Sequence, residues 1–329
     1  MKKTLFFLII IIQLSYISYL GIKIVDNKKN TLGTVNLNPI KKDYIISSPG
    51  SELKYFYEPK SNSVTTDAEW VNLYKDGEYK TNTDGLRERF DYPVSSNDKT
   101  FRIITLGDSF TWSLFVEVEN IWPEVLEKSL NSLNCSKINK FEVINLAMAG
   151  YDLQYSLERY KLRGQKYHPD LIIWLIKDDD FTELNEIMYI KMNGIEKNMK
   201  KSGEYQALVE DGVPFPAYGK TKEVMTDIYN KNEEVIIKRQ VSYLNELFDY
   251  FNKRLLITAL FDPQDKYKKA LKEFKNSRPN IYYFDKIRNF YLVNGSFTPK
   301  DWHPNKLGHK IIAEDLSNYL TKTKLIPCK

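Results

Sequence analysis

Ser109, in the tripeptide Gly107-Asp108-Ser109, is a candidate nucleophile because of the residues that surround it in the sequence. The preceding segment, 101–106, is short, apolar and rich in β-branched residues, which predicts a buried strand. It ends at a glycine, which turns the chain without a Cβ clash, and at Asp and Ser, which favour turns and helix starts. The Ser109 hydroxyl is therefore expected at the carboxyl end of a strand, where open α/β sheets bind their ligands. Taken alone, the tripeptide fits a helix-capping turn as well as it fits a nucleophile.

A nucleophilic serine requires a general base, a group that orients this base, and donors for the oxyanion. His303 can be the base, because it lies between the last predicted strand and the final helix, and so at the same sheet edge. Asp301 can reach its ring and hold the tautomer. The other histidines fit the role less well. His309 lies nearly two turns further on, which predicts a surface position, and His168 precedes the third strand, at the opposite sheet edge.

The elements that position these residues alternate between strand and helix from residue 101 onward, which predicts an α/β domain with a parallel sheet. Apolar segments predict five strands, at 101–106, 142–146, 170–176, 255–261 and 280–284. Helical spacing of apolar residues predicts helices after 120, at 152–165, 232–253 and 265–276, and after 301. Residues 183–229 contain many Met, Gly and Pro residues, and we expect there an irregular inserted lid or loop over the site.

The N-terminal residues 1–25 combine Lys2 and Lys3 with an apolar run of about 19 residues, which predicts a signal peptide or a signal anchor. No clear cleavage site follows the run. We therefore expect an uncleaved membrane anchor with the catalytic domain outside the cytoplasm, and a secreted protein if the segment is cleaved. Residues 26–100 predict a polar linker and then a small β-rich lead-in without a core of its own.

The composition excludes several function classes. The 329 residues carry a net charge of +5, but Lys and Arg are dispersed among nearly as many acids, so no nucleic-acid-binding stripe is expected. The loop after the first strand lacks the Gly-rich phosphate cradle of a flavin- or nucleotide-binding domain. The acidic run 178–180 is not supported as a metal site by a histidine or a second acidic cluster. We expect neither a cofactor nor a metal.

Four blocks of the chain together resemble those of the SGNH/GDSL hydrolases. They are Gly107-Asp108-Ser109, Gly150 after the second strand, the acidic cluster after the third, and Asp301-x-His303-Pro-Asn. The resemblance covers about residues 101–322. The segment Asn82-Thr-Asp-Gly-Leu-Arg87 also looks like the lead-in of the extracytoplasmic branch of that superfamily. The resemblance implies a three-layer flavodoxin-like domain, placed at 101–325, and hydrolysis or transfer of esters without a cofactor.

The resemblance also implies roles for single residues. Ser109 would be the nucleophile, His303 the base and Asp301 its orienter, and the backbone N–H groups of Ser109 and Gly150 would belong to the oxyanion hole. Asp179 falls where the family carries an Asn that donates to the oxyanion, and an ionised carboxylate has no proton to donate. Either Asp179 is kept protonated by burial and its neighbours, or Lys177 supplies positive charge, or activity is low or absent.

Two functions from different classes follow. The first is an anchored, extracytoplasmic ester hydrolase or acyl-ester transferase that acts on an acylated cell-surface glycan or lipid. The second, motivated by Asp179, is a degenerate SGNH domain that binds a glycan without catalysis. Aromatic residues make up 14% of the chain and are mostly tyrosine, which suits surfaces that grip sugars or other chains.

The two cysteines, Cys135 and Cys328, predict a disulfide. Cys135 follows the first helix of the domain and Cys328 follows the last. In a sheet of order 2-1-3-4-5 these two helices cover the same face, so their carboxyl ends meet at the edge opposite the site. An even cysteine count behind a signal segment permits such a bridge.

Overall fold

The computed structural model describes residues 45–48, 50–66, 78–210, 216–260, 263–293, 297 and 302–328. The predicted anchor at 1–25 and the predicted orienter Asp301 lie outside these residues. Among the residues described, no helix is both long enough and apolar enough to cross a bilayer.

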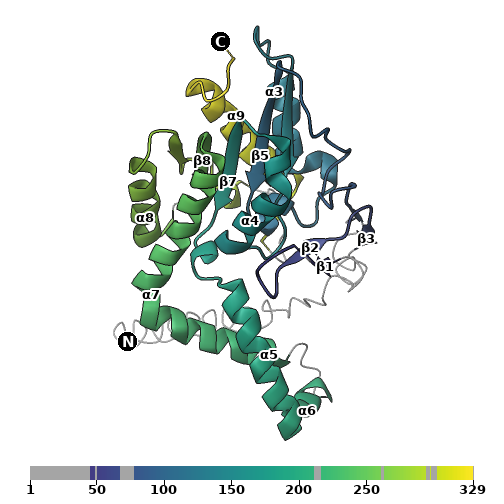
Figure 1. The fold of residues 1–329 in the computed structure, drawn as a ribbon, viewed down its shortest axis with the longest axis vertical. Coiled ribbons are helices and arrows are strands. Elements are labelled where there is room, and N and C mark those ends of the chain that lie inside the picture. The colour runs from purple at the N-terminus through teal and green to yellow at the C-terminus, as the bar shows by residue number, and fades with distance from the viewer. Residues whose placement is uncertain are drawn as a thin grey trace, which may run out of the picture. The chain divides into compact units, whose positions relative to one another are not determined.

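A five-stranded parallel sheet forms the centre of the domain (Figure 1). Its strands are β5 (Thr100–Leu106), β6 (Lys140–Asn145), β7 (Leu171–Ile176), β8 (Arg254–Ala259) and β9 (Ile281–Phe284). They are arranged in the order β6-β5-β7-β8-β9, and each neighbouring pair is parallel. This is the predicted 2-1-3-4-5 order. Every residue of β7 is buried, as expected for a strand that is covered on both faces.

Helices connect the strands and cover both faces of the sheet. The helices are α2 (Ser109–Trp112), α3 (Trp122–Asn131), α4 (Leu153–Arg159), α5 (Asn185–Ser202), α6 (Glu204–Glu210), α7 (Pro216–Phe251), α8 (Asp265–Asn276) and α9 (Lys306–Lys322). One core lies between the sheet and α4, α7 and α8, and a second lies between the sheet and α3 and α9. The fold is therefore a three-layer α/β/α domain of the flavodoxin-like kind, which confirms the predicted fold class.

Two short antiparallel strand pairs precede the sheet. They are β1 (Ile45–Ser47) with β2 (Tyr57–Pro59), and β3 (Val64–Thr66) with β4 (Glu78–Lys80). Their buried aromatic residues, Phe56 and Tyr79, pack in one cluster with Trp112, Met148 and Tyr155 of the main domain. The lead-in is thus β-rich, and these two aromatic residues are buried against the domain.

The predicted irregular loop at 183–229 is wrong, because most of this segment is helical. It contains α5, α6 and the first half of α7, and α5 packs against both of the other helices. The predicted start of a helix at Asn232 coincides instead with a kink inside α7. Met, Lys and Glu are good helix formers. They outweigh the single glycines of the segment, each of which destabilises a helix by only about 1 kcal/mol relative to alanine. Its role as a lid stays a prediction.

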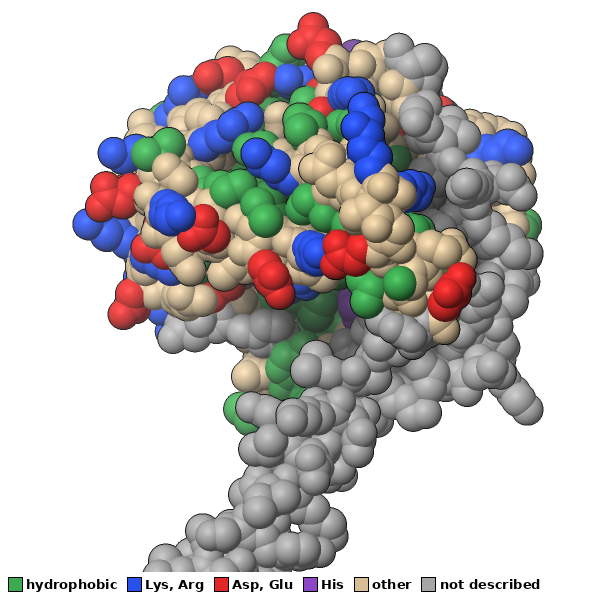
Figure 2. Space-filling model, turned by 90° about the horizontal axis from the view of Figure 1, so that it is seen from below, with side chains coloured by type: hydrophobic (Ala, Val, Ile, Leu, Met, Phe, Trp, Pro, Cys, Tyr) green, Lys and Arg blue, Asp and Glu red, His purple; other side chains and the backbone are tan. Residues whose placement is uncertain are grey.

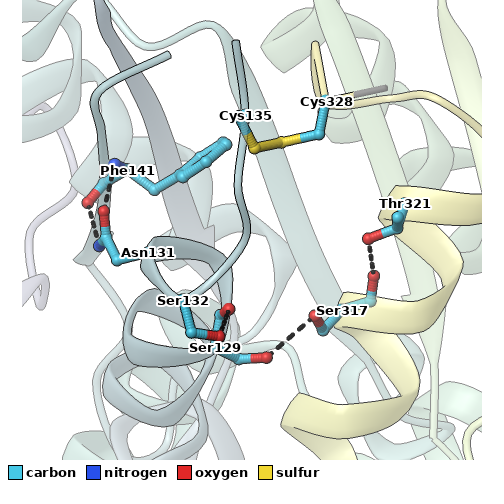
Figure 3. Close-up of a disulfide and its surroundings, with 8 residues drawn as sticks. All are labelled: Ser129, Asn131, Ser132, Cys135, Phe141, Ser317, Thr321 and Cys328. Atoms are coloured by element: carbon cyan, nitrogen blue, oxygen red, sulfur yellow. Dashed lines mark hydrogen bonds between the residues drawn. A yellow bond between two sulfur atoms is a disulfide. The ribbon is translucent and has the colours of Figure 1, made fainter.

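A disulfide joins Cys135 and Cys328, whose Cα atoms lie 4.8 Å apart (Figure 3). Close to it, the Ser129 and Ser317 hydroxyls of α3 and α9 are hydrogen-bonded at 3.1 Å. The bridge lies beyond the carboxyl ends of these two helices, which run against the strands on one face. The predicted pairing is confirmed, and it ties the end of the chain to the segment after α3.

His309 is buried, so the predicted surface position is wrong. Its side chain faces α3, and Nδ1 accepts a hydrogen bond of 3.3 Å from the backbone N–H of Trp122. Burial, together with the positive charge of Arg87, lowers the pKa of His309 to about 3. The histidine is therefore neutral in the folded protein over the whole physiological pH range.

Replacing His309 with glutamine should remove a pH dependence of stability. Between about pH 6.5 and 3 the unfolded histidine binds a proton that the folded one does not, so stability falls as the pH drops through this range. One such proton changes the unfolding free energy by about 1.4 kcal/mol per pH unit. Denaturant titrations at pH 7, 6, 5 and 4 measure the difference between wild type and His309→Gln. Identical pH profiles for the two proteins would contradict this expectation, and exposed His168→Gln is the matched control.

On the face seen in Figure 2, side chains of Lys and Arg are interspersed with those of Asp and Glu. This mixed pattern is what the even distribution of charged residues along the sequence predicts for that face.

Candidate active site

The nucleophile candidate lies at the junction of β5 and α2. Asp108 caps α2 by accepting a hydrogen bond of 2.9 Å from the Phe110 N–H, and Ser109 is the first helical residue. Gly107 has φ 149°, and a Cβ there would lie 2.5 Å from Thr111 Oγ1 and 2.9 Å from the Leu175 carbonyl oxygen. Only glycine fits this turn, which aims Ser109 out of the sheet at the carboxyl end of β5, an inner strand.

His303 reaches Ser109 from the other end of the domain sequence. Its Nε2 lies 2.8 Å from Ser109 Oγ, which is hydrogen-bonding distance. The imidazole ring packs against Phe110, with centroids 4.8 Å apart, and meets Phe115 edge-on at 5.8 Å. Asn305 starts α9 two residues later by accepting from the N–H groups of Leu307 and Gly308. The structure therefore brings together the serine and the histidine that the sequence predicted as nucleophile and base.

Gly150 lies after β6, at the same edge of the sheet. It has φ 78°, and a Cβ at this position would come within 2.8 Å of the Tyr57 hydroxyl. Its carbonyl accepts a hydrogen bond of 2.5 Å from the Asn185 side chain. This geometry explains a glycine here, and the oxyanion role of its N–H stays a prediction. His168 is exposed just before β7, at the opposite edge, as expected.

The acidic run after β7 surrounds a lysine that is mostly buried. The Lys177 ammonium lies 2.6 Å from Asp108 Oδ2, and 2.9 and 2.7 Å from the two carboxylate oxygens of Asp179. It also lies 4.5 Å from the centroid of the Phe110 ring, beside the nucleophile. Although burial acts to lower it, the nearby charges of Asp108, Asp180 and Asp179 raise the pKa of Lys177 well above its ordinary value.

This arrangement bears on the three alternatives for Asp179. Its side chain is 50% exposed, and both carboxylate oxygens accept hydrogen bonds from Lys177. A carboxylate in this state acts as an acceptor. The structure thus pairs Asp179 with Lys177, and the supply of positive charge to the oxyanion by Lys177 stays a prediction.

The other two acids of the run have structural partners. Asp178 accepts hydrogen bonds from the Gln264 N–H at 3.2 and 3.3 Å. Asp180 is buried, and its Oδ2 accepts a hydrogen bond of 2.7 Å from the Lys177 N–H. Burial, with the negative charge of Asp108, raises the pKa of Asp180 well above its ordinary value. In the part of the chain that the structure describes, no group of three or more His, Cys, Asp and Glu residues could hold a metal ion.

Glu183 is a further acid of the site that sequence reasoning missed. It follows the acidic run, and its N–H donates a hydrogen bond of 2.7 Å to the Asp179 carbonyl. Burial, together with the charge of Asp179, raises the pKa of Glu183 to about 8. The side chain is thus mainly protonated at neutral pH and can donate a hydrogen bond. No motif marks Glu183 in the sequence.

Arg87 of the lead-in was also missed as part of the site. Its buried guanidinium donates hydrogen bonds to the carbonyl of Trp112, the last residue of α2, and to those of Ser113 and Val116 in the loop that follows. Ser113 and Phe115 of this loop have φ 73° and 61°, in the left-handed region that such residues rarely adopt. The bonds from Arg87 hold this loop, and with it the Phe115 ring that meets His303.

The comparison with protein families agrees with this geometry. Residues 103–316 match the family model described as GDSL-like Lipase/Acylhydrolase. Because the match covers more than half of the chain, the protein belongs to this family. It is a serine ester hydrolase of the GDSL type.

Several solved structures are similar to part of this chain at low sequence identity. A lipase/acylhydrolase from Enterococcus faecalis is 12% identical, with a TM-score of 0.43, over 70% of this chain and 99% of that one. A catalytic mutant of an acetylxylan esterase from Geobacillus stearothermophilus is 13% identical, with a TM-score of 0.44, over 70% and 96%. A two-domain esterase active on acetylated mannans is 11% identical, with a TM-score of 0.43, over 70% of this chain and 52% of that one. The search of the curated proteins finds no match.

Proposed function

We propose that the protein cleaves or transfers an acyl ester on a cell-surface glycan or lipid outside the cytoplasm, with Ser109 as nucleophile. The single observation that carries the catalytic part is the 2.8 Å approach of His303 Nε2 to Ser109 Oγ. The disulfide between Cys135 and Cys328 supports an oxidising compartment. The apolar N-terminal run supports a membrane anchor.

In this proposal Ser109 Oγ attacks the ester carbonyl carbon while His303 Nε2 takes the hydroxyl proton. The oxyanion that forms is met by the N–H groups of Ser109 and Gly150 and by the nearby charge of Lys177. Collapse of the tetrahedral intermediate breaks the bond to the alcohol oxygen, which takes the proton from His303. Water, or a second alcohol in a transfer reaction, then attacks the acyl-serine with His303 again as base. Asp301 keeps its proposed role as orienter of the imidazole.

The alternative function is a glycan-binding domain without catalysis, which Asp179 suggests. A fluorophosphonate probe distinguishes the two. The probe labels only a serine that is activated as a nucleophile. We expect wild-type protein to be labelled, the label to map to Ser109 by peptide mass spectrometry, and Ser109→Ala to remain unlabelled. Folded wild-type protein that takes no label would favour the binding domain.

Asp179→Asn should raise the esterase rate. The substitution removes a negative charge beside the developing oxyanion and provides an amide donor, and one such donor changes the rate by about 10²–10³ in other hydrolases. Initial rates with p-nitrophenyl acetate measure the change. Asp178→Asn is the matched control, because it removes the same charge from the neighbour that binds the Gln264 N–H. A lower rate in folded Asp179→Asn would mean that the carboxylate is needed to hold Lys177.

A further inference from the structure

An exposed stack of aromatic rings lies next to His303. Trp302 is 57% exposed, and its ring lies parallel to that of Phe297, with an angle of 9° and centroids 5.2 Å apart. Tyr291 meets both rings edge-on, at 5.8 Å from Trp302 and 5.4 Å from Phe297. Its hydroxyl donates a hydrogen bond of 2.7 Å to the Trp302 carbonyl. One face of the indole is therefore backed by Phe297, while more than half of the Trp302 surface is open to solvent.

The backbone of Trp302 is held in an uncommon conformation. Its φ is 67°, and the left-handed region costs a bulky residue about 1–3 kcal/mol, so it persists only where neighbours enforce it. The hydrogen bond from Tyr291 and the stack on Phe297 supply that support. A contiguous exposed group of apolar rings, held in place at the cost of backbone strain, is the kind of feature that marks a binding surface.

The position of the stack restricts what can bind there. Trp302 directly precedes His303, whose Nε2 contacts Ser109 Oγ. An ester whose carbonyl carbon is attacked by Ser109 extends in two directions, and one of its parts must lie beside the loop that carries His303. The indole thus belongs to the residue directly before the base, on the loop that flanks the scissile bond.

We propose that Trp302, backed by Phe297 and Tyr291, is a stacking subsite for a pyranose ring in the alcohol part of the substrate. The inference rests on the proposed esterase function and narrows its substrate from glycan or lipid to glycan. A flat, polar-edged aromatic ring suits the C–H face of a sugar. Asp179, whose side chain is 50% exposed, provides a partner for sugar hydroxyls at this edge of the sheet, and an alkyl chain would leave this polar group desolvated.

Binding is measured first, in the Ser109→Ala variant, so that the ligand is not hydrolysed during the titration. Isothermal titration uses acetylated xylo-, manno- and gluco-oligosaccharides, with monoacylglycerol as the lipid ester. We expect at least one oligosaccharide to bind, and Trp302→Ala to weaken it about tenfold or more. Trp302→Phe should restore most of the affinity, because it keeps a stacking face. Tyr250→Ala is the matched control, since Tyr250 is an equally exposed aromatic at the end of α7, at the opposite sheet edge.

Kinetics of the otherwise unchanged enzyme give the second readout. Trp302→Ala should raise KM for the acetylated oligosaccharide about tenfold, with a much smaller effect on kcat and on KM for p-nitrophenyl acetate, which has no sugar. The proposal is overturned if only the lipid ester binds, or if Trp302→Ala binds the oligosaccharide as wild type does. It is also overturned if Trp302→Ala raises KM equally for the oligosaccharide and for p-nitrophenyl acetate. If the wild-type enzyme hydrolyses neither ester, the esterase function fails while the titrations still decide the sugar subsite.

Discussion

Replacing Ser109 with alanine should abolish the turnover of p-nitrophenyl acetate, with a fall in kcat of about 10⁴-fold or more. The reason is the geometry of the pair: without Oγ, His303 Nε2 has no hydroxyl to deprotonate at 2.8 Å and no acyl-enzyme can form. Asp301→Asn should leave a small residual activity, about a hundredfold above that of Ser109→Ala, since an orienting residue contributes less than the nucleophile.

Rates are measured with purified protein whose circular dichroism matches that of the wild type. Ser129→Ala provides the control for the chemical change alone, because Ser129 lies on α3 near the disulfide, at the other edge of the sheet. Equal rates for wild type and Ser109→Ala would remove Ser109 as the nucleophile.

Loss of the disulfide should lower the free energy of unfolding by about 2–5 kcal/mol. The bridge closes a loop of 193 residues, and in the chain-entropy model a loop of this length restricts the unfolded chain by about 5 kcal/mol. Denaturant titrations of wild type and of the Cys135→Ser/Cys328→Ser variant give the difference. The kcat of the variant should stay within about twofold, because the cysteines lie at the sheet edge opposite Ser109.

A reductant separates the bridge from the side chains themselves. Treated with dithiothreitol, the wild type should move to the denaturation midpoint of the double-serine variant, and the variant should not move. A wild-type midpoint that ignores the reductant, or a double-serine variant as stable as the wild type, would contradict the stabilising role of this disulfide.

The sheet and the Ser109–His303 pair were predictable because alternating strands and helices leave few topologies open. Because β5 is an inner strand of a parallel sheet, its carboxyl end and the loop before the last helix share one edge. The same topology made the disulfide predictable. These features follow from the order of strands and helices along the chain and from the handedness of their connections, and a single sequence is enough to predict that order.

Other features depend on contacts between distant segments. The pairing of Lys177 with Asp108 requires β5 and β7 to be neighbours, and the burial of His309 requires α3 to lie across from it. For His309 a signal was present, because it shares a helical face with buried Ile312 and Leu316, three and seven residues on. The helices of 183–229 were missed because single Gly and Pro residues were given more weight than the helix formers between them.

The packing of α3 against α9 also determines when, during synthesis, the core between them can form. The buried face of α3, with Trp122, Leu126 and Leu130, is covered by the face of α9 that carries Ile312 and Leu316. The 174 residues from Ser132 to Asn305 separate the two helices. At about 5–20 residues per second, a ribosome needs about 10–40 s to supply the second helix. For most of that interval the nascent chain carries an uncovered apolar helix face and lacks His303, so the serine has no base until the segment before α9 is made.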